Sequence, residues 1–179
     1  NGLFLSSSSN NTLNNNTAAS NALRGIYLFS NSNNNRFVSN CVDSNIAAGF
    51  RIENSSANAI LQNDVSKGDT GVLITGSSSG NTIGKNNITS AFTSVLNLGG
   101  LTQTLTRNWF GSVDSSAIAS KMIDTANVWL PFRLATVDTT AGADTTAPKA
   151  PDTVAVIGSP SDTSVIIEWS AVSALEEAN

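Results

Sequence analysis

The sequence has no histidine and a single cysteine, Cys41. Without histidine, the chain lacks the commonest general base and the commonest metal ligand of proteins. One cysteine excludes an internal disulfide framework. No apolar run is long enough to span a membrane, and no charged-then-apolar signal region opens the chain. The chain therefore offers no histidine for acid–base catalysis or metal binding and no internal disulfide.

Charged residues are also scarce, at 12% of the 179 residues. Nine Lys and Arg against thirteen Asp and Glu give a net charge of −4, so there is no basic stripe and nucleic acid is disfavoured as a partner. The chain is nevertheless 40% hydrophobic, and its polarity comes from Asn, Ser, Thr and Gly. Plentiful, periodic apolar residues argue against disorder.

Asparagine recurs in the pattern Asn-x-apolar-x-x-Asn, which occurs five times with Gln opening the last copy. The opening position is held by Asn11, Asn35, Asn58, Asn81 and Gln103. The closing position is held by Asn16, Asn40, Asn63, Asn86 and Asn108. Both series advance by 24, 23, 23 and 22 residues, which defines an internal repeat.

Apolar positions keep the same spacing. Between the two asparagines lie Leu13, Phe37, Ile60, Ile83 and Leu105. Two residues after the second lie Ala18, Val42, Val65, Ile88 and Phe110. An upstream apolar pair recurs as Leu3/Leu5, Ile26/Leu28, Phe50/Ile52, Val72/Ile74 and Leu96/Leu98, and in four copies a glycine precedes it. Alternation over such short segments predicts strands separated by turns.

No copy could bury its apolar face alone, so the copies are expected to stack as coils about 4.8 Å apart. Asn tolerates the left-handed backbone of tight corners, and stacked side-chain amides can bond to one another as ladders. We therefore expect all ten opening and closing residues to face inward. Asn63→Ala should then destabilise far more than Asn31→Ala or Asn33→Ala in the variable turn.

Residues 1–110 resemble the right-handed parallel β-helix repeat of pectate-lyase-like enzymes, polysaccharide epimerases, phage tailspikes and bacterial surface proteins. The resemblance rests on the pattern G-I-x-L … N-x-I-x-x-N-x-I. It implies an all-β solenoid of about five coils, and the handedness comes from the resemblance alone.

Residues 111–134 break the repeat and are predicted to cap the last coil. A short helix is expected to begin near Asp114–Ser116, with Ile118, Met122 and Ile123 on one face. Its partners in covering the coil are Trp109, Trp129 and Phe132. The stretch from Asn108 to Gly111 also resembles the Asn-aromatic-aromatic-Gly segment that closes bacterial β-helix domains. The alternative role for the tryptophans is a sugar-stacking platform.

A Thr/Ala/Asp/Pro linker is predicted over 135–150. Residues 151–179 resemble the first two strands of a fibronectin type III domain, with Trp169 as its core tryptophan. Such a sandwich needs roughly 100 residues, so this segment is expected to be incomplete. The first residue, Asn1, falls inside a repeat, and we read the chain as a fragment.

The coil register places Tyr27, Phe29, Arg51 and Glu53 in one outward patch. Aromatic rings beside an Arg and a carboxylate can stack on sugars and hydrogen-bond their hydroxyls. The alternative is that Arg51 and Glu53 are solvated and the rings pack under a loop.

A candidate metal set consists of Asp43, Asp64 and Asp69, with Lys67 nearby. Polysaccharide lyases that this repeat resembles hold calcium with outward carboxylates and use Lys or Arg as the base. Calcium needs several converging oxygens, so ordinary solvated turn residues are the simpler interpretation. Calcium is left open as a cofactor without support from the sequence, and no other cofactor is expected.

No catalytic constellation is visible in the chain, which leaves open whether the full protein is an enzyme. The resemblance implies a secreted or cell-surface bacterial protein that binds or processes a polysaccharide or cell-surface glycan, with this part non-catalytic. The alternatives are a structural or adhesive rod, and a lyase or epimerase whose active site lies on other coils. No membrane span is expected, and the oligomeric state stays open.

Overall fold

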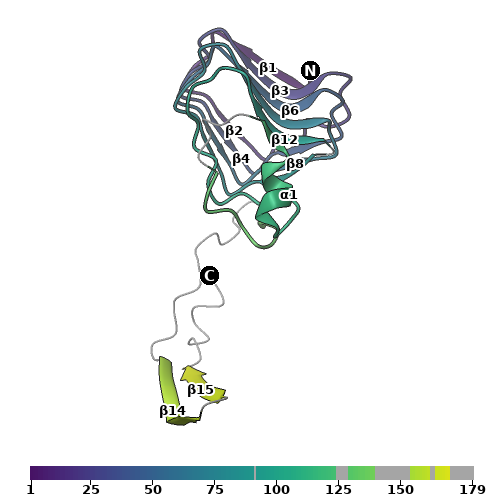
Figure 1. Ribbon diagram of the computed structural model, residues 1–179. Helices are drawn as coiled ribbons and strands as arrows, with labels where there is room; N and C mark the ends of the chain where they lie inside the picture. The colour runs from purple at the N-terminus through teal and green to yellow at the C-terminus, as the bar shows by residue number, and fades with distance from the viewer. Residues whose placement is uncertain (91, 124–128, 140–153, 162–163, 170–179) are drawn as a thin grey trace. The chain divides into compact units, whose positions relative to one another are not determined.

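The computed structural model describes residues 1–90, 92–123, 129–139, 154–161 and 164–169. These residues belong to two compact units, Asn1–Ala143 and Asp144–Asn179. In the first unit the chain winds into stacked coils, with its N-terminus at one end of the stack and α1 (Ser115–Ala119) at the other (Figure 1).

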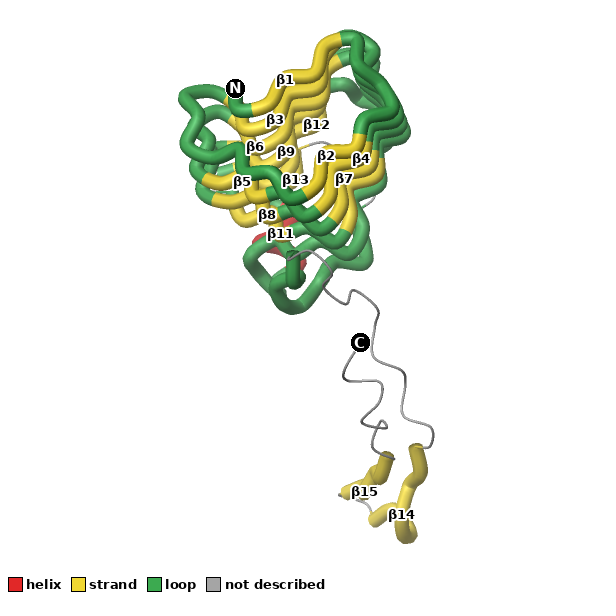
Figure 2. Tube along the Cα trace, turned by 180° about the vertical axis from the view of Figure 1, so that it is seen from behind, coloured by secondary structure: helices red, strands yellow, loops and turns green. Residues whose placement is uncertain are grey.

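Three parallel sheets form the walls of the coil stack (Figure 2). Sheet A has six strands in the order β1 (Leu3–Ser6), β3 (Arg24–Phe29), β6 (Ala48–Glu53), β9 (Thr70–Thr75), β12 (Thr93–Asn97) and β13 (Met122–Ile123). Sheet B has β2 (Thr12–Asn14), β4 (Arg36–Val38), β7 (Ala59–Leu61) and β10 (Thr82–Gly84). Sheet C has β5 (Cys41–Asp43), β8 (Asp64–Ser66) and β11 (Asn87–Thr89).

A complete coil contributes one strand to each sheet, so equivalent residues of successive copies pair directly. Ile26 pairs with Phe50, Phe37 with Ile60, and Val42 with Val65. The predicted all-β solenoid of about five coils is confirmed.

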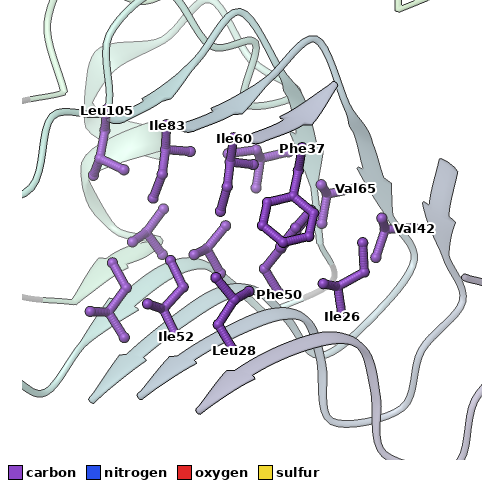
Figure 3. Close-up of a cluster of buried hydrophobic side chains, with 14 of the residues drawn as sticks. Ile26, Leu28, Phe37, Val42, Phe50, Ile52, Ile60, Val65, Ile83 and Leu105 are labelled. Atoms are coloured by element: carbon purple, nitrogen blue, oxygen red, sulfur yellow. The ribbon is translucent and has the colours of Figure 1, made fainter. Parts of the chain in front are cut away.

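The apolar residues of the three walls meet in a continuous core inside the coils (Figure 3). Sheet A supplies two columns and sheets B and C one each, and nearly every member is fully buried. Phe37 and Phe50 are the largest fully buried side chains, with ring centroids 5.7 Å apart in an edge-to-face arrangement. Leu3, Leu5 and Leu13 of the first coil are only partly buried, because no described coil covers them.

The asparagine columns form directional ladders. The backbone N–H and Nδ2 of Asn40 both donate to Oδ1 of Asn63, at 2.9 Å each. Asn63 donates to Asn86 in the same way, and Asn86 to Asn108. In the other ladder, Gln103 takes the last position and accepts from Asn81 N and Nδ2 at 3.1 Å.

Two more ladders occur that the Asn motif does not reveal. The backbone N–H of each serine donates to the Oγ of the equivalent serine in the next coil. The series runs from Ser8 through Ser32 and Ser55 to Ser78. Asn21 donates to Asn45 at a third corner. The same 23- to 24-residue spacing in the sequence is the signal that could have found both.

The left-handed backbone lies one residue before the ladder asparagines, not at them. The residues with positive φ that precede the closing asparagines are Asn15, Ser39, Gln62, Lys85 and Arg107. The expectation that the ladder asparagines themselves turn the corner through αL is therefore wrong, although a neighbouring asparagine such as Asn15 does so. A ladder residue keeps ordinary backbone geometry because its amide must point to the next coil, so its neighbour makes the turn.

In the fifth coil the predicted inward pair Leu96/Leu98 is wrong, because the inward positions lie one residue earlier. Val95 and Asn97 pair with Val72 and Ile74 and occupy the inward positions. Leu98 is 66% exposed. Asn97 is tolerated inside because its Nδ2 donates to the carbonyl of Leu101 at 3.0 Å.

The predicted short helix is present as α1, which Asp114 caps by accepting from Ser116 N–H at 2.8 Å. Ile118 is its buried residue. The placement of Met122 and Ile123 on that helix is wrong, because they form β13 and pair with β12. Edge pairing satisfies backbone groups that the fifth coil would otherwise expose.

Residues 129–137 complete the cap without regular secondary structure. Arg107 N–H donates to the carbonyl of Pro131 at 2.6 Å, and Arg133 N–H donates to the carbonyl of Asn108 at 2.8 Å. Trp129 and Phe132 stack on each other and pack against the core. This supports a covering role for both side chains.

In the second unit, β14 (Val154–Ser161) and β15 (Ser164–Trp169) pair antiparallel, with Val154 opposite Trp169. The two predicted strands are therefore present. The core role expected for Trp169, and the predicted linker from residue 140 onward, lie outside what the structure describes.

Candidate ligand-binding surface

Six side chains gather on the outer surface of β1, β3 and β6 and are called the aromatic–arginine patch: Phe4, Arg24, Tyr27, Phe29, Arg51 and Glu53. Phe4 pairs with Tyr27 and Tyr27 with Arg51 in the register of sheet A. Phe29 pairs with Glu53 in the same way. The structure thus brings together all four side chains that the sequence predicts here, and it adds Phe4 and Arg24.

The three rings of the patch form one cluster. The ring centroid of Tyr27 lies 5.1 Å from that of Phe4 and 5.8 Å from that of Phe29. The guanidinium carbons of Arg24 and Arg51 lie over the Tyr27 ring, 5.0 and 5.2 Å from its centroid. Contacts at these distances are favourable cation–π interactions.

Glu53 organises the polar part of the patch. Its Oε2 accepts a hydrogen bond from the Tyr27 hydroxyl at 2.5 Å and forms an ion pair with an Arg51 terminal nitrogen at 2.6 Å. Burial and this hydrogen bond raise the pKa of Tyr27, so the phenol stays a proton donor. Arg51 Nε is buried without a hydrogen-bond partner.

Arg24 has no carboxylate within ion-pair distance among the residues that the structure describes. Two arginines against one glutamate leave one net positive charge on the patch, in a chain whose net charge is −4. Sequence reasoning missed Arg24 because it lies beside the glycine column, outside the alternating pattern. Phe4 occupies the same position in the first coil as Tyr27 does in the second, so the repeat was the signal that could have found it.

A second polar cluster lies on sheet C. Lys67 Nζ and Ser66 Oγ donate to the two carboxylate oxygens of Asp43, at 3.1 and 2.9 Å. Burial alone would raise the pKa of Asp43, but hydrogen bonds from Lys67 and Ser66 outweigh it, and the pKa lies below its usual value. For Asp64, burial and the neighbouring Asp43 charge raise the pKa.

The third predicted metal ligand, Asp69, is exposed at the corner that leads into sheet A. Within the described ranges, no three His, Cys, Asp or Glu side chains gather closely enough to hold a metal ion. The structure therefore gives Asp43 a lysine and a serine as partners, with Asp64 as its neighbouring carboxylate.

A family model matches residues 1–146, which include the coils and the cap. The family is described as periplasmic copper-binding protein (NosD). No curated protein and no solved structure matches the chain. The match gives nothing specific to pectate lyases or to fibronectin type III domains.

The donor set of the chain does not fit copper. Copper sites use thiolate, thioether and imidazole ligands, and the whole chain has no histidine, one cysteine and one methionine. Cys41 is exposed on sheet C, whereas Met122 packs against the core from sheet A. Burial, with the charges of Asp64 and Asp43, raises the pKa of Cys41 and opposes formation of the thiolate.

The periplasmic location in the family description confirms the expectation of a bacterial protein that works outside the cytoplasm. Among the described residues, no helix is long and apolar enough to cross a membrane. The family model covers most of the chain, including every coil from which the repeat was derived. The chain belongs to the NosD family.

Proposed function

We propose that this chain is a non-catalytic, exported β-helix domain that binds a polysaccharide or cell-surface glycan through the aromatic–arginine patch. The observation that carries the proposal is the convergence of three rings and three charged side chains on one outer wall. The Phe4 ring belongs to the outward row of sheet A and contacts the Tyr27 and Phe29 rings, at centroid distances of 5.1 and 6.4 Å. An exposed ring can cover the apolar face of a pyranose, while Arg and Glu groups bond its hydroxyls.

The second candidate is a structural or adhesive rod. The four ladders and the continuous core favour it, because they stabilise the stack without providing any reactive group. A lyase or epimerase would need convergent carboxylates. Of the outward carboxylates in the described coils, Glu53 is paired with Arg51 and Asp43 with Lys67, while Asp64 lies beside Asp43 and forms no ion pair there. We also propose that β14 and β15 begin a fibronectin type III-like sandwich that serves as a spacer.

Screening the chain on a glycan array tests the proposal. We expect binding by the unchanged protein, loss of binding in Phe4→Ala, and weakened binding in Tyr27→Ala and Arg51→Ala. Phe92→Ala is the matched control, because Phe92 is 72% exposed and lies in the fifth coil. Retained folding is checked by thermal melting of each variant. A chain that binds no glycan on the array leaves the rod as the better description.

A further inference from the structure

We propose that the aromatic–arginine patch selects a saccharide that carries an anionic group, and that Arg24 and Arg51 bind this group directly, without a bridging metal ion. This inference rests on the proposed function and specifies the class of its ligand. The anionic group is a carboxylate or a sulfate on the sugar.

The orientation of the rings provides the first argument. Tyr27 is covered by Phe4 from the preceding strand and by the Arg51 guanidinium from the following strand. Strands about 4.8 Å apart leave little room between stacked side chains, so Tyr27 presents its edge to solvent. Ring edges carry partial positive charge and ring faces partial negative charge. At Tyr27, the ring edge is therefore compatible with a neighbouring anion.

The unpaired charge of Arg24 provides the second argument. Its guanidinium lies against Tyr27 but has no carboxylate partner in the described part of the chain. Arg51 uses a terminal nitrogen for Glu53, and a guanidinium has further N–H donors. The guanidinium carbons of Arg24 and Arg51 lie 5.0 and 5.2 Å from the centroid of the Tyr27 ring. Both guanidiniums therefore contact the same ring, and one anionic group beside Tyr27 would contact both.

Glu53 limits where the anion can lie. Its Oε2 holds both the Tyr27 hydroxyl and Arg51, so the glutamate is part of the scaffold of the patch. Repulsion from Glu53 directs the anion toward Arg24. A calcium bridge would need several oxygen ligands, and Asp43 and Asp64 lie on sheet C while the patch is on sheet A. Recognition of the charge must then come from the arginines.

The inference is tested by calorimetric titration with three probes: a hexuronate tetrasaccharide, a sulfated tetrasaccharide and a neutral tetrasaccharide of the same linkage. Binding of either charged probe should be stronger than that of the neutral one by about tenfold or more, as charge-assisted hydrogen bonds give. Added salt should weaken only the charged probes. Chelator and added calcium should have no effect.

Arg24→Gln should abolish the preference for the charged probes and leave neutral binding in place. Arg24→Lys keeps the charge and should keep part of the preference. The matched control is Arg36→Gln, because Arg36 is exposed on β4 in sheet B and should not matter. If Arg24→Gln does not melt cooperatively, Arg24→Lys takes its place in the comparison.

The outcomes separate the two proposals. If the neutral probe binds as tightly as the charged ones, saccharide binding stands and the inference about charge is wrong. Binding of charged probes only with calcium would overturn direct recognition by the arginines, as would a preference unchanged in Arg24→Gln. A protein that binds none of the three probes overturns both proposals.

Discussion

Asn63→Ala is the most informative perturbation of the coil stack. Asn63 is fully buried, and its Nδ2 donates to the carbonyls of Phe37 and Leu61 and to Oδ1 of Asn86. Its Oδ1 accepts from the backbone N–H and Nδ2 of Asn40. Alanine removes all five contacts and leaves the Asn40 N–H without its acceptor.

The magnitude follows from these bonds. A buried N–H without an acceptor costs about 1–3 kcal/mol. Loss of the hydrogen bonds made by the two Nδ2 protons of Asn63 costs a further ~1 kcal/mol for each proton, the value of a typical neutral hydrogen bond. The free energy of unfolding should therefore fall by about 3–5 kcal/mol. For a domain of this size that loss corresponds to a decrease in Tm of about 10 °C.

Thermal melting followed by far-UV circular dichroism measures this decrease. The best control is Asn14→Ala, because Asn14 is exposed on β2 and should change stability by no more than about 0.5 kcal/mol. Asn33 is a poorer control than the sequence indicates, since its Oδ1 accepts from Ser56 N–H at 2.7 Å. Asn31 has a φ of 61°, so alanine there adds backbone strain. Equal losses of Tm in Asn63→Ala and Asn14→Ala would refute the ladder as a source of stability.

Three further outcomes are expected. Gly49→Ala should destabilise by about 1–3 kcal/mol in a urea titration, because the new Cβ would lie 2.3 Å from Val65 Cγ1; unchanged stability would contradict the close approach of sheets A and C. Ala57→Gly should raise the free energy of unfolding by about 0.5–1 kcal/mol, since Ala57 has a φ of 56°; a lower Tm would argue against αL strain at this corner. Because burial, with the Asp64 and Asp43 charges, raises the pKa of Cys41, its alkylation should be slower than that of a free thiol at pH 8, and its rate should rise at a higher pH. Asp64→Asn should shift that rate profile to lower pH, and an unshifted profile would exclude the carboxylate as a cause.

The coil register of the first four copies could be read from the sequence because one requirement repeats in every coil. Each coil needs an apolar residue and a side-chain amide at equivalent positions. Phe37 of one coil pairs with Ile60 of the next, and Asn40 of one coil donates to Asn63 of the next. A single repeating contact leaves a periodic signal, so alignment of the copies recovers it without coordinates. The outward positions of Tyr27 and Arg51 follow from the same register.

The end of the stack was not predictable in this way. Asn97 faces inward because the carbonyl of Leu101 accepts its Nδ2, a contact that has no counterpart in the other coils. Met122 and Ile123 join sheet A because the edge of β12 has backbone groups to satisfy, which no local helical pattern can reveal. The final coil meets a different neighbour, so its residues depart from the repeat.

The sequence by itself determined the parallel β-helix, its register in the first four coils and the wall on which the aromatic side chains lie. Tertiary structure alone decided the chemistry of that wall. It brought Arg24 against Tyr27, with no carboxylate partner for Arg24 among the described residues, and it joined Glu53 to both Tyr27 and Arg51. The physical reason is that a repeat specifies which residues share a column, whereas ion pairs and ring contacts depend on side-chain directions between neighbouring columns.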